Sequence, residues 1–352
     1  MPVISARGLA RTFRTRRAAG GKRPPVVEAV AGVDIDVAAG ELVGFLGPNG
    51  AGKTTTLRML TTLLVPTAGT ATVAGHDLLT DPIGVRRRIG YVGQNGGAGP
   101  DCLVVDELIL QGRFYGLSHD RARTRAAELL EQLNLTGTER RVVSTLSGGQ
   151  RRRLDIAMGL MHVPKLLFMD EPSTGLDPQS RANLWEHIRS LHAEHGTTLF
   201  LTTHYLDEAD ALCDRILVID KGRIVAGGTP DELKRRVSGD LVVVGADEAG
   251  RVAELAARLP GSTEVAVDGA SIRFRMPDGA RALPALLREL DAADVAMTSV
   301  EVRRPSLDDV FLTLTGRSLR DADENGPGSP ESDPGDNGTE PVAPVRTAGG
   351  AR

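Results

Sequence analysis

The sequence predicts an α/β fold built on a mainly parallel sheet, and three observations support this prediction. An apolar stretch that starts at Glu41 runs into a glycine-rich turn and then into a helix that begins near Gly52. Nearly continuous apolar runs follow at 165–170, 197–202 and 215–219, as is typical of strands buried on both faces. Helical stretches separate these runs, so strands and helices alternate along the chain.

The segments before and after the first helix have different patterns. Residues 3–13 and 26–37 alternate apolar and polar positions, which predicts half-buried antiparallel strands. Between them, Arg14–Pro25 is basic and contains glycine and proline. A solvated hairpin connection is favoured over a nucleic-acid or lipid patch, because no aromatic residues interleave the charges. Residues 106–161 carry apolar positions at helical spacing without a clear strand, which predicts a mainly helical insertion.

After Arg236 the pattern changes to a small α+β unit. The order of its elements suits a ferredoxin-like fold, and we expect a final helix at 306–315 to pack on that unit. The expected strands are 241–244, 263–267, 271–276 and 296–302, and the expected helices are 248–259 and 281–290.

The last residues differ in composition from the rest of the chain. Residues 317–352 are acidic, rich in proline, glycine and serine, and free of aromatic residues, so we expect a disordered tail. The predicted domains are therefore 3–236, with a helical part at about 95–162, then 240–316, and then the tail.

Composition excludes several classes of protein. The net charge of −4 in 352 residues gives no overall positive field that would attract nucleic acid or anionic membranes. Only Cys102 and Cys213 occur, without a CxxC pair, which argues against a disulfide framework or a cysteine-based zinc site. No apolar run approaches the roughly 18 residues of a membrane span, and the first residues lack the apolar stretch of a secretion signal. We expect a cytosolic chain that can still dock to a membrane protein.

The glycine-rich turn matches the phosphate-binding pattern G-x-x-x-x-G-K-[ST]. Its glycines let backbone N–H groups turn toward phosphate oxygens, and the helix N-terminus adds a positive dipole end. We expect Lys53 to neutralise the β and γ oxygens of a nucleotide and Thr54 to place its hydroxyl on Mg²⁺. The predicted nucleotide-contacting residues are Gly47, Pro48, Asn49, Gly50, Ala51, Gly52, Lys53, Thr54 and Thr55.

Two carboxylates follow the apolar run 166–169, at the strand edge where open α/β sheets bind ligands. We expect Asp170 to hold Mg²⁺, directly or through water. We expect Glu171 to orient, or accept a proton from, the water that attacks the γ-phosphate. Acidic residues often end a strand for solubility alone, but the upstream phosphate loop favours the catalytic interpretation.

A short motif, LSGGQ at Leu146–Gln150, lies between these two segments. Its serine is predicted to cap a helix at 149–162, and the same N-terminal amides can bind an anion. Three arginines follow, Arg151 to Arg153. Because consecutive residues of a helix point in different directions, we expect a solvated face rather than a nucleic-acid surface, with one arginine toward the LSGGQ turn or toward a second copy in a dimer.

These motifs, in this order and spacing, resemble the nucleotide-binding subunits of ABC (ATP-binding cassette) transporters over about residues 3–236. The resemblance implies a P-loop NTPase fold with an antiparallel β subdomain, a helical subdomain and a small C-terminal α+β domain. It also implies ATP and Mg²⁺ as cofactors and a second ATP-binding subunit, most simply an identical copy. In that family the signature motif contacts the γ-phosphate held by the partner, which here assigns Ser147, Gly148, Gly149 and Gln150 to the nucleotide.

The resemblance implies roles for four more residues. Gln94 would contact Mg²⁺ or water and sense the membrane partner, and His204 would hydrogen-bond the γ-phosphate. Asp177, in the loop that starts at Gly175, would cross to the other monomer. Phe13 lies where an aromatic residue stacks on adenine, although the family more often has tyrosine there and a core position is the alternative.

The end of the chain indicates a subtype. Residues 304–316 (RPSLDDVFLTLTG), with the small domain before them, resemble the C-terminal region of daunorubicin-resistance-type ATP-binding subunits. Those subunits pair with ABC-2 type permeases, which implies a peripheral protein at the cytoplasmic face of the membrane. It implies ATP-driven export of a drug, an antibiotic or a lipid-like compound.

Two alternatives are an importer subunit and an ABC ATPase that transports nothing. Ribosome-acting relatives typically carry two cassettes, whereas one phosphate loop and one signature occur here. DNA-repair relatives carry a long coiled coil between the two motifs, and the interval from Lys53 to Leu146 is too short for it and lacks sustained heptads. We therefore expect no nucleic-acid partner.

Overall fold

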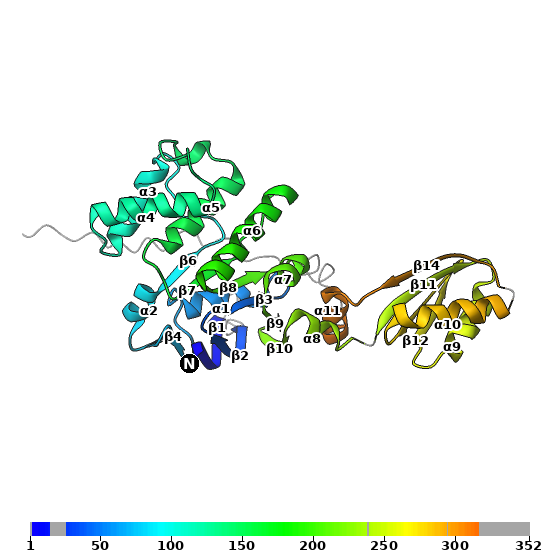
Figure 1. The fold of residues 1–352 in the computed structure, drawn as a ribbon. Helices are drawn as coiled ribbons and strands as arrows, with labels where there is room; N and C mark the ends of the chain where they lie inside the picture. Colours follow the sequence, from blue (N-terminus) through cyan, green and yellow to red (C-terminus); the bar gives the residue numbers. More distant parts are fainter. Residues whose placement is uncertain (1, 15–25, 238, 294, 317–352) are drawn as a thin grey trace, which may run out of the picture.

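The computed structural model describes residues 2–14, 26–237, 239–293 and 295–316, and these residues form three sheets with helices around them (Figure 1). The predicted tail at 317–352 and most of the predicted basic loop, 15–25, lie outside the described residues.

The central sheet has six strands in the order β10-β9-β3-β8-β7-β6. Its pairs are parallel except for the antiparallel edge pair β9 and β10. The predicted apolar runs form β7, β8 and β9 to within one residue, so the α/β prediction is confirmed. The strands are β3 (Leu42–Leu46), β6 (Ile89–Val92), β7 (Leu166–Asp170), β8 (Thr198–Thr203), β9 (Arg215–Asp220) and β10 (Arg223–Gly228).

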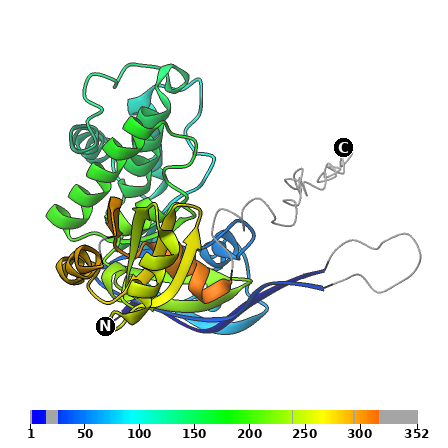
Figure 2. The ribbon, with the colours of Figure 1, turned by 90° about the vertical axis from the view of Figure 1, so that its right-hand side faces the viewer.

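A second, antiparallel sheet of four strands and helix α1 (Lys53–Leu60) both pack against the central sheet. The two sheets share one apolar core, in which the rings of Phe45, Phe168 and Phe200 pack against one another. Figure 2 shows β1 and β2 as a long hairpin that extends away from this core. The strands are β1 (Pro2–Arg14), β2 (Val26–Ala38), β4 (Ala68–Val73) and β5 (His76–Asp77).

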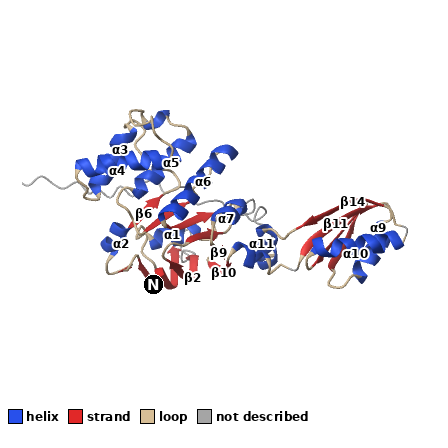
Figure 3. Cartoon of the chain, viewed as in Figure 1, coloured by secondary structure: helices blue, strands red, loops and turns tan. Residues whose placement is uncertain are grey.

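The chain between the central strands β6 and β7 is helical, as the apolar spacing predicts, and forms a separate group at the top of Figure 3. It contains α3 (Val104–Phe114), α4 (His119–Gln132) and α5 (Gly148–Leu160). A close approach fixes α5 to the sheet: a Cβ on Gly90 of β6 would lie 2.3 Å from the carbonyl oxygen of Gly159. The remaining helices of this part of the chain are α2 (Pro82–Arg88), α6 (Pro178–His195), α7 (Leu206–Leu212) and α8 (Pro230–Lys234).

The third sheet has the order β12-β13-β11-β14, with every neighbouring pair antiparallel. With two helices inserted between the strands, this is the predicted ferredoxin-like arrangement. Its own apolar core includes Val244, Phe274 and Leu286. The elements are β11 (Asp240–Ala246), α9 (Ala249–Arg258), β12 (Thr263–Asp268), β13 (Ser271–Met276), α10 (Gly279–Ala292) and β14 (Met297–Arg303).

The last helix, α11 (Leu307–Thr315), does not pack where the sequence analysis placed it. Its buried side chains Leu307, Val310 and Phe311 belong to the core of the first 237 residues, and α11 contacts α7 and α8. The reason is that α9 and α10 already cover the apolar core of the small domain. An ion pair from Arg275 of β13 to Asp309, at 2.8 Å, links α11 to the third sheet.

This packing predicts a stability effect. Phe311 is 1 % exposed, whereas the next residue, Leu312, is 45 % exposed. Phe311→Ala should therefore lower the free energy of unfolding by about 3 kcal/mol, and Leu312→Ala should change it little. Denaturant unfolding of both variants checks this. Equal losses for the two variants would contradict the packing of α11 described here.

Among the described residues, no helix has the length and apolar character needed to span a membrane.

Candidate active site

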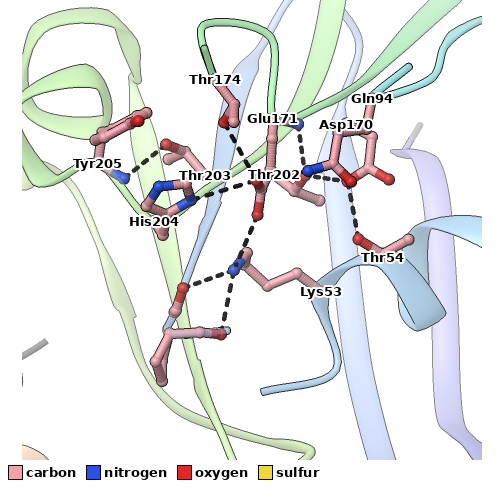
Figure 4. A network of polar contacts seen from close by, with 12 residues as sticks. Lys53, Thr54, Gln94, Asp170, Glu171, Thr174, Thr202, Thr203, His204 and Tyr205 are labelled. Atoms are coloured by element: carbon pink, nitrogen blue, oxygen red, sulfur yellow. Dashed lines mark hydrogen bonds and ion pairs between the residues drawn. The ribbon is translucent and has the colours of Figure 1, made fainter. Parts of the chain in front are cut away.

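The candidate site lies where β3, β7 and β8 end and α1 begins (Figure 4). The loop between β3 and α1 can be built only with glycine at two positions. A Cβ on Gly47 would lie 2.3 Å from the carbonyl oxygen of Ile219, and one on Gly52 would lie 2.5 Å from that of Ala29. Gly52 also has a φ of 105°, which side chains rarely adopt. The loop is thus held against β9 and β2.

Lys53 is almost fully buried inside this loop. Its ammonium donates hydrogen bonds to the carbonyl oxygens of Gly47 at 2.8 Å and Pro48 at 3.1 Å. It also lies 3.3 Å from Oε1 of Glu171. One positive charge therefore connects the phosphate-binding loop with the end of β7.

Asp170 brings together oxygen atoms from three elements. Its Oδ1 accepts hydrogen bonds from Thr202 Oγ1 at 2.6 Å and Thr54 Oγ1 at 3.1 Å. Burial raises the pKa of the Asp170 carboxyl, and the two hydroxyls act in the opposite direction. Carboxylate and hydroxyl oxygens are hard ligands of the kind that Mg²⁺ prefers, together with water and phosphate oxygens. The adjacent oxygens of Thr54 and Asp170 therefore fit a magnesium site.

The backbone at Glu171 is in the left-handed region, with a φ of 45°. Its N–H donates to the carbonyl oxygen of Thr202 at 3.1 Å and to the hydroxyl of the same residue at 3.0 Å. These bonds fix the turn at the end of β7. Backbone strain in a non-glycine residue is often found at functional sites.

Four side chains surround the Glu171 carboxylate. Lys53 lies near Oε1, and the other three lie near Oε2. Thr174 donates to Oε2 at 3.2 Å, Gln94 donates to it at 3.4 Å, and Nδ1 of His204 lies 3.3 Å away. The sequence analysis assigned Lys53, Gln94, Glu171 and His204 to one nucleotide site. The structure brings these four residues together in one network of contacts (Figure 4).

These contacts decide the charge of Glu171. Burial by itself would raise the pKa of its carboxyl, but the hydrogen bond from His204 and the charge of Lys53 outweigh it and lower the pKa from 4.5 to about 2. Glu171 is therefore ionised at neutral pH.

The lowered pKa predicts how stability depends on pH. The ionised Glu171 side chain should stabilise the fold fully above about pH 4.5, and this contribution should disappear as the pH falls toward 2. The effect amounts to about 3 kcal/mol at most. Unfolding of the nucleotide-free wild type and Glu171→Gln at several pH values checks it: the two should converge in stability between pH 5 and pH 2. Parallel curves would contradict the assignment.

The signature residues form a second group. Ser147 caps α5: the N–H of Gln150 donates to its hydroxyl at 3.2 Å, and its own N–H donates to Oε1 of Gln150 at 3.1 Å. The predicted cap is therefore confirmed. A Cβ on Gly149 would lie 3.2 Å from the side chain of Ser180, whose N–H is held by Asp177 at 2.9 Å. The signature turn and the loop ending at Asp177 thus lie side by side on one surface.

Phe13 lies near the end of β1, opposite Val27 of β2. The residue is 38 % exposed, with the guanidinium of Arg11 4.8 Å from the centroid of its ring. The core position considered from the sequence is therefore wrong for Phe13. Stacking on adenine stays a prediction.

Sequence reasoning missed Thr202, Thr174 and the role of Arg152. In the sequence, Thr202 is only the end of an apolar run. The structure shows that its hydroxyl donates a hydrogen bond to Asp170. The expectation of a solvated arginine face was wrong for Arg152, which is 7 % exposed. Its neighbours do point elsewhere: Arg151 is exposed, and Arg153 contacts His187 at 3.1 Å.

Comparisons with known proteins agree with this architecture. The family model described as "ABC transporter" matches residues 30–174, and the model of the "ATP-binding protein DrrA1-3-like, C-terminal domain" matches residues 228–315.

Curated relatives match most of the chain. It is 48 % identical over 295 residues to the daunorubicin resistance ATP-binding protein DrrA3 of Streptomyces coeruleorubidus, covering 83 % of this chain and 93 % of that protein. It is 38 % identical to the linearmycin resistance ATP-binding protein LnrL of Bacillus subtilis, covering 83 % and 95 %. It is 41 % identical to the Nod factor export ATP-binding protein I of Cupriavidus metallidurans, covering 82 % and 93 %.

A solved structure shares the fold. A dimeric ATP-binding cassette in a post-hydrolysis state, bound to ADP and Pi, has a TM-score of 0.57 and 25 % sequence identity to this chain. The match covers 64 % of this chain and 98 % of that cassette.

Proposed function

This chain belongs to the ABC transporter family, among its drug-resistance ATP-binding subunits, and we propose that two copies close over two ATP molecules to drive export through a separate permease. The chain is the ATP-binding and ATP-hydrolysing subunit of such an exporter. The observation that carries the proposal is the network around Glu171, in which an ionised carboxylate lies among Lys53, Gln94 and His204.

The contacts of Glu171 suggest how hydrolysis is timed. Lys53 lies 3.3 Å from this carboxylate and helps to keep its pKa low, so Glu171 is a weak proton acceptor in this arrangement. A γ-phosphate in the loop would attract Lys53 and neutralise its charge. The pKa of Glu171 would then rise, because the charge of Lys53 would no longer oppose the effect of burial, while the hydrogen bond from His204 would still lower it. The residue would become a better base when ATP is in place.

Thr54 and Asp170 would hold Mg²⁺ through the two oxygen atoms that now share a hydrogen bond, with Gln94 nearby. Bound there, Mg²⁺ would offset the negative charge of the β and γ oxygens. Lys53 would bind the same oxygens, and His204 would orient the γ-phosphate. Glu171 would orient the attacking water.

We propose that the site is completed by the second copy. Ser147 and Gly149 lie in a group of their own at the start of α5, where Ser147 and Gly148 are exposed, with Asp177 beside them. A helix N-terminus with a serine cap suits a phosphate brought by another subunit. The solved cassette of similar fold is dimeric, which supports this arrangement.

We propose that the exported compound is a drug, an antibiotic or a lipid-like compound and that the permease is of the ABC-2 type. For the compound, the support comes from relatives named for daunorubicin resistance, linearmycin resistance and Nod factor export. For the permease type, it is the resemblance of the C-terminal region to that of daunorubicin-resistance-type subunits. The chain would then work at the cytoplasmic face of the membrane.

Purification of the tagged chain from its native membranes tests the proposed partner. We expect an ABC-2 type permease to co-purify, and inverted vesicles that contain the pair to accumulate daunorubicin in an ATP-dependent manner. An importer permease, or co-purification with ribosomes instead of a membrane protein, would contradict the assignment. A permease of the expected type with no daunorubicin transport would overturn only the choice of compound.

A further inference from the structure

Helix α5 holds the ends of two loops that carry predicted catalytic residues. The guanidinium of Arg152 donates to the carbonyl oxygens of Gly93 at 2.5 Å, Asp170 at 2.9 Å and Pro172 at 2.8 Å. Gly93 precedes Gln94, and the other two carbonyls lie on either side of Glu171. A planar guanidinium with fixed donor directions restrains all three segments relative to one another.

One turn further along α5, Asp155 contacts the same loop from its other end. Its Oδ1 accepts the backbone N–H of Gly97 at 3.0 Å. Gly96 approaches so closely that a Cβ there would lie 2.9 Å from Oδ2 of Asp155. The loop that carries Gln94 is thus held at both ends: Arg152 donates to the carbonyl of Gly93, and Asp155 accepts from the N–H of Gly97.

The burial of Arg152 argues for a specific role. A buried cation loses its hydration, and burial lowers the pKa of this guanidinium, while the nearby carboxylate of Asp155 acts in the opposite direction. Its three strong hydrogen bonds go to backbone carbonyls of the loops that carry Gln94 and Glu171. A long apolar side chain would fill the same space without this desolvation cost.

We propose that Arg152 and Asp155 are positioning residues for ATP hydrolysis, which fix Gln94 and Glu171 to the helix that begins at Ser147. The proposal rests on the function proposed above. These contacts tie the loops of Gln94 and Glu171 to the helix that carries the signature serine.

Arg152→Met is the first test, since methionine keeps much of the length and packing of the side chain. We expect kcat for ATP to fall roughly 10- to 100-fold, because small displacements of catalytic groups are that costly, with ATP affinity nearly unchanged. Arg121→Met is the control: this arginine is exposed on α4, and we expect wild-type kcat. An Arg152→Met protein with wild-type kcat would overturn the proposal.

A pair of variants at Asp155 provides the conservative comparison. The amide oxygen of Asp155→Asn can still accept the N–H of Gly97, so kcat should stay near the wild-type value. Asp155→Leu removes the acceptor and should lower kcat as Arg152→Met does. Burial raises the pKa of the Asp155 carboxyl, while the hydrogen bond from Gly97 and the charge of Arg152 act in the opposite direction. Equal kcat values for the two variants would contradict the role of this contact.

A last experiment distinguishes a positioning role of Arg152 from a structural role, and tests the dimer mechanism separately. In a Glu171→Gln background, Arg152→Met should still form the ATP-dependent dimer. If the double variant loses both ATP affinity and the dimer, Arg152 is structural and the proposal fails. If Glu171→Gln alone stays monomeric, the dimer mechanism fails, while kcat and ATP affinity of Arg152→Met still decide whether the residue positions the site.

Discussion

Glu171→Gln is expected to lower kcat for ATP roughly 10²- to 10⁴-fold while ATP affinity stays close to the wild-type value. The amide can keep several hydrogen bonds of the carboxylate, including the one from Thr174, but it cannot accept a proton. It also carries no negative charge that would compete with phosphate for Lys53. Steady-state hydrolysis and equilibrium ATP binding measured on the same preparation check both parts.

The matched control is Glu131→Gln, an exposed carboxylate on α4, which should hydrolyse ATP at the wild-type rate. A Glu171→Gln protein that retains a tenth or more of wild-type kcat would assign the base to another group. A loss of ATP affinity equal to the loss of rate would point to a binding role for Glu171 instead.

Lys53→Ala is expected to abolish hydrolysis and to weaken ATP binding severely. The phosphate-binding loop encloses the ammonium of Lys53. Without this positive charge, the carbonyls of Gly47 and Pro48 lose their donor, and the bound phosphate loses a counter-charge. Loss of such a charge-stabilising donor costs about 10²- to 10³-fold in rate or more. Binding of a fluorescent ATP analogue and phosphate release measure the two effects.

Lys165→Ala serves as the control for Lys53→Ala, because Lys165 is exposed and lies just before β7, at the end of the strand opposite to Asp170. It should bind and hydrolyse ATP as the wild type does. Comparable activity of Lys53→Ala and this control would rule out the assigned nucleotide site.

The residues that could be predicted from the sequence are those whose chemistry is local. The glycine pattern identified the loop that holds Lys53, and the apolar run before Asp170 placed two carboxylates at the end of a buried strand. Ser147 was predicted as a helix cap, since capping depends on residues within one turn. The ferredoxin-like order followed from alternation and helical spacing in the same way.

The features that could not be predicted depend on contacts between distant segments. Helical geometry indicates that Arg151, Arg152 and Arg153 diverge, but only the carbonyls at the ends of β6 and β7 decide that the second one is buried. Likewise, the sequence predicts the apolar face of α11, but it does not show that this face packs on the core of the first 237 residues. The core of the small domain is covered by its own helices α9 and α10. The apolar face of α11 therefore packs against α7 and α8.

The central claim is that ATP in one copy is held also by Ser147 of another, and the oligomeric state of Glu171→Gln tests it most directly. By size-exclusion chromatography with light scattering, this variant should be a dimer in saturating Mg-ATP and a monomer without nucleotide. Adding Ser147→Arg should leave ATP binding by the monomer intact and prevent the dimer. A Glu171→Gln protein that stays monomeric with ATP, or that dimerises equally well with Ser147→Arg, would contradict the account.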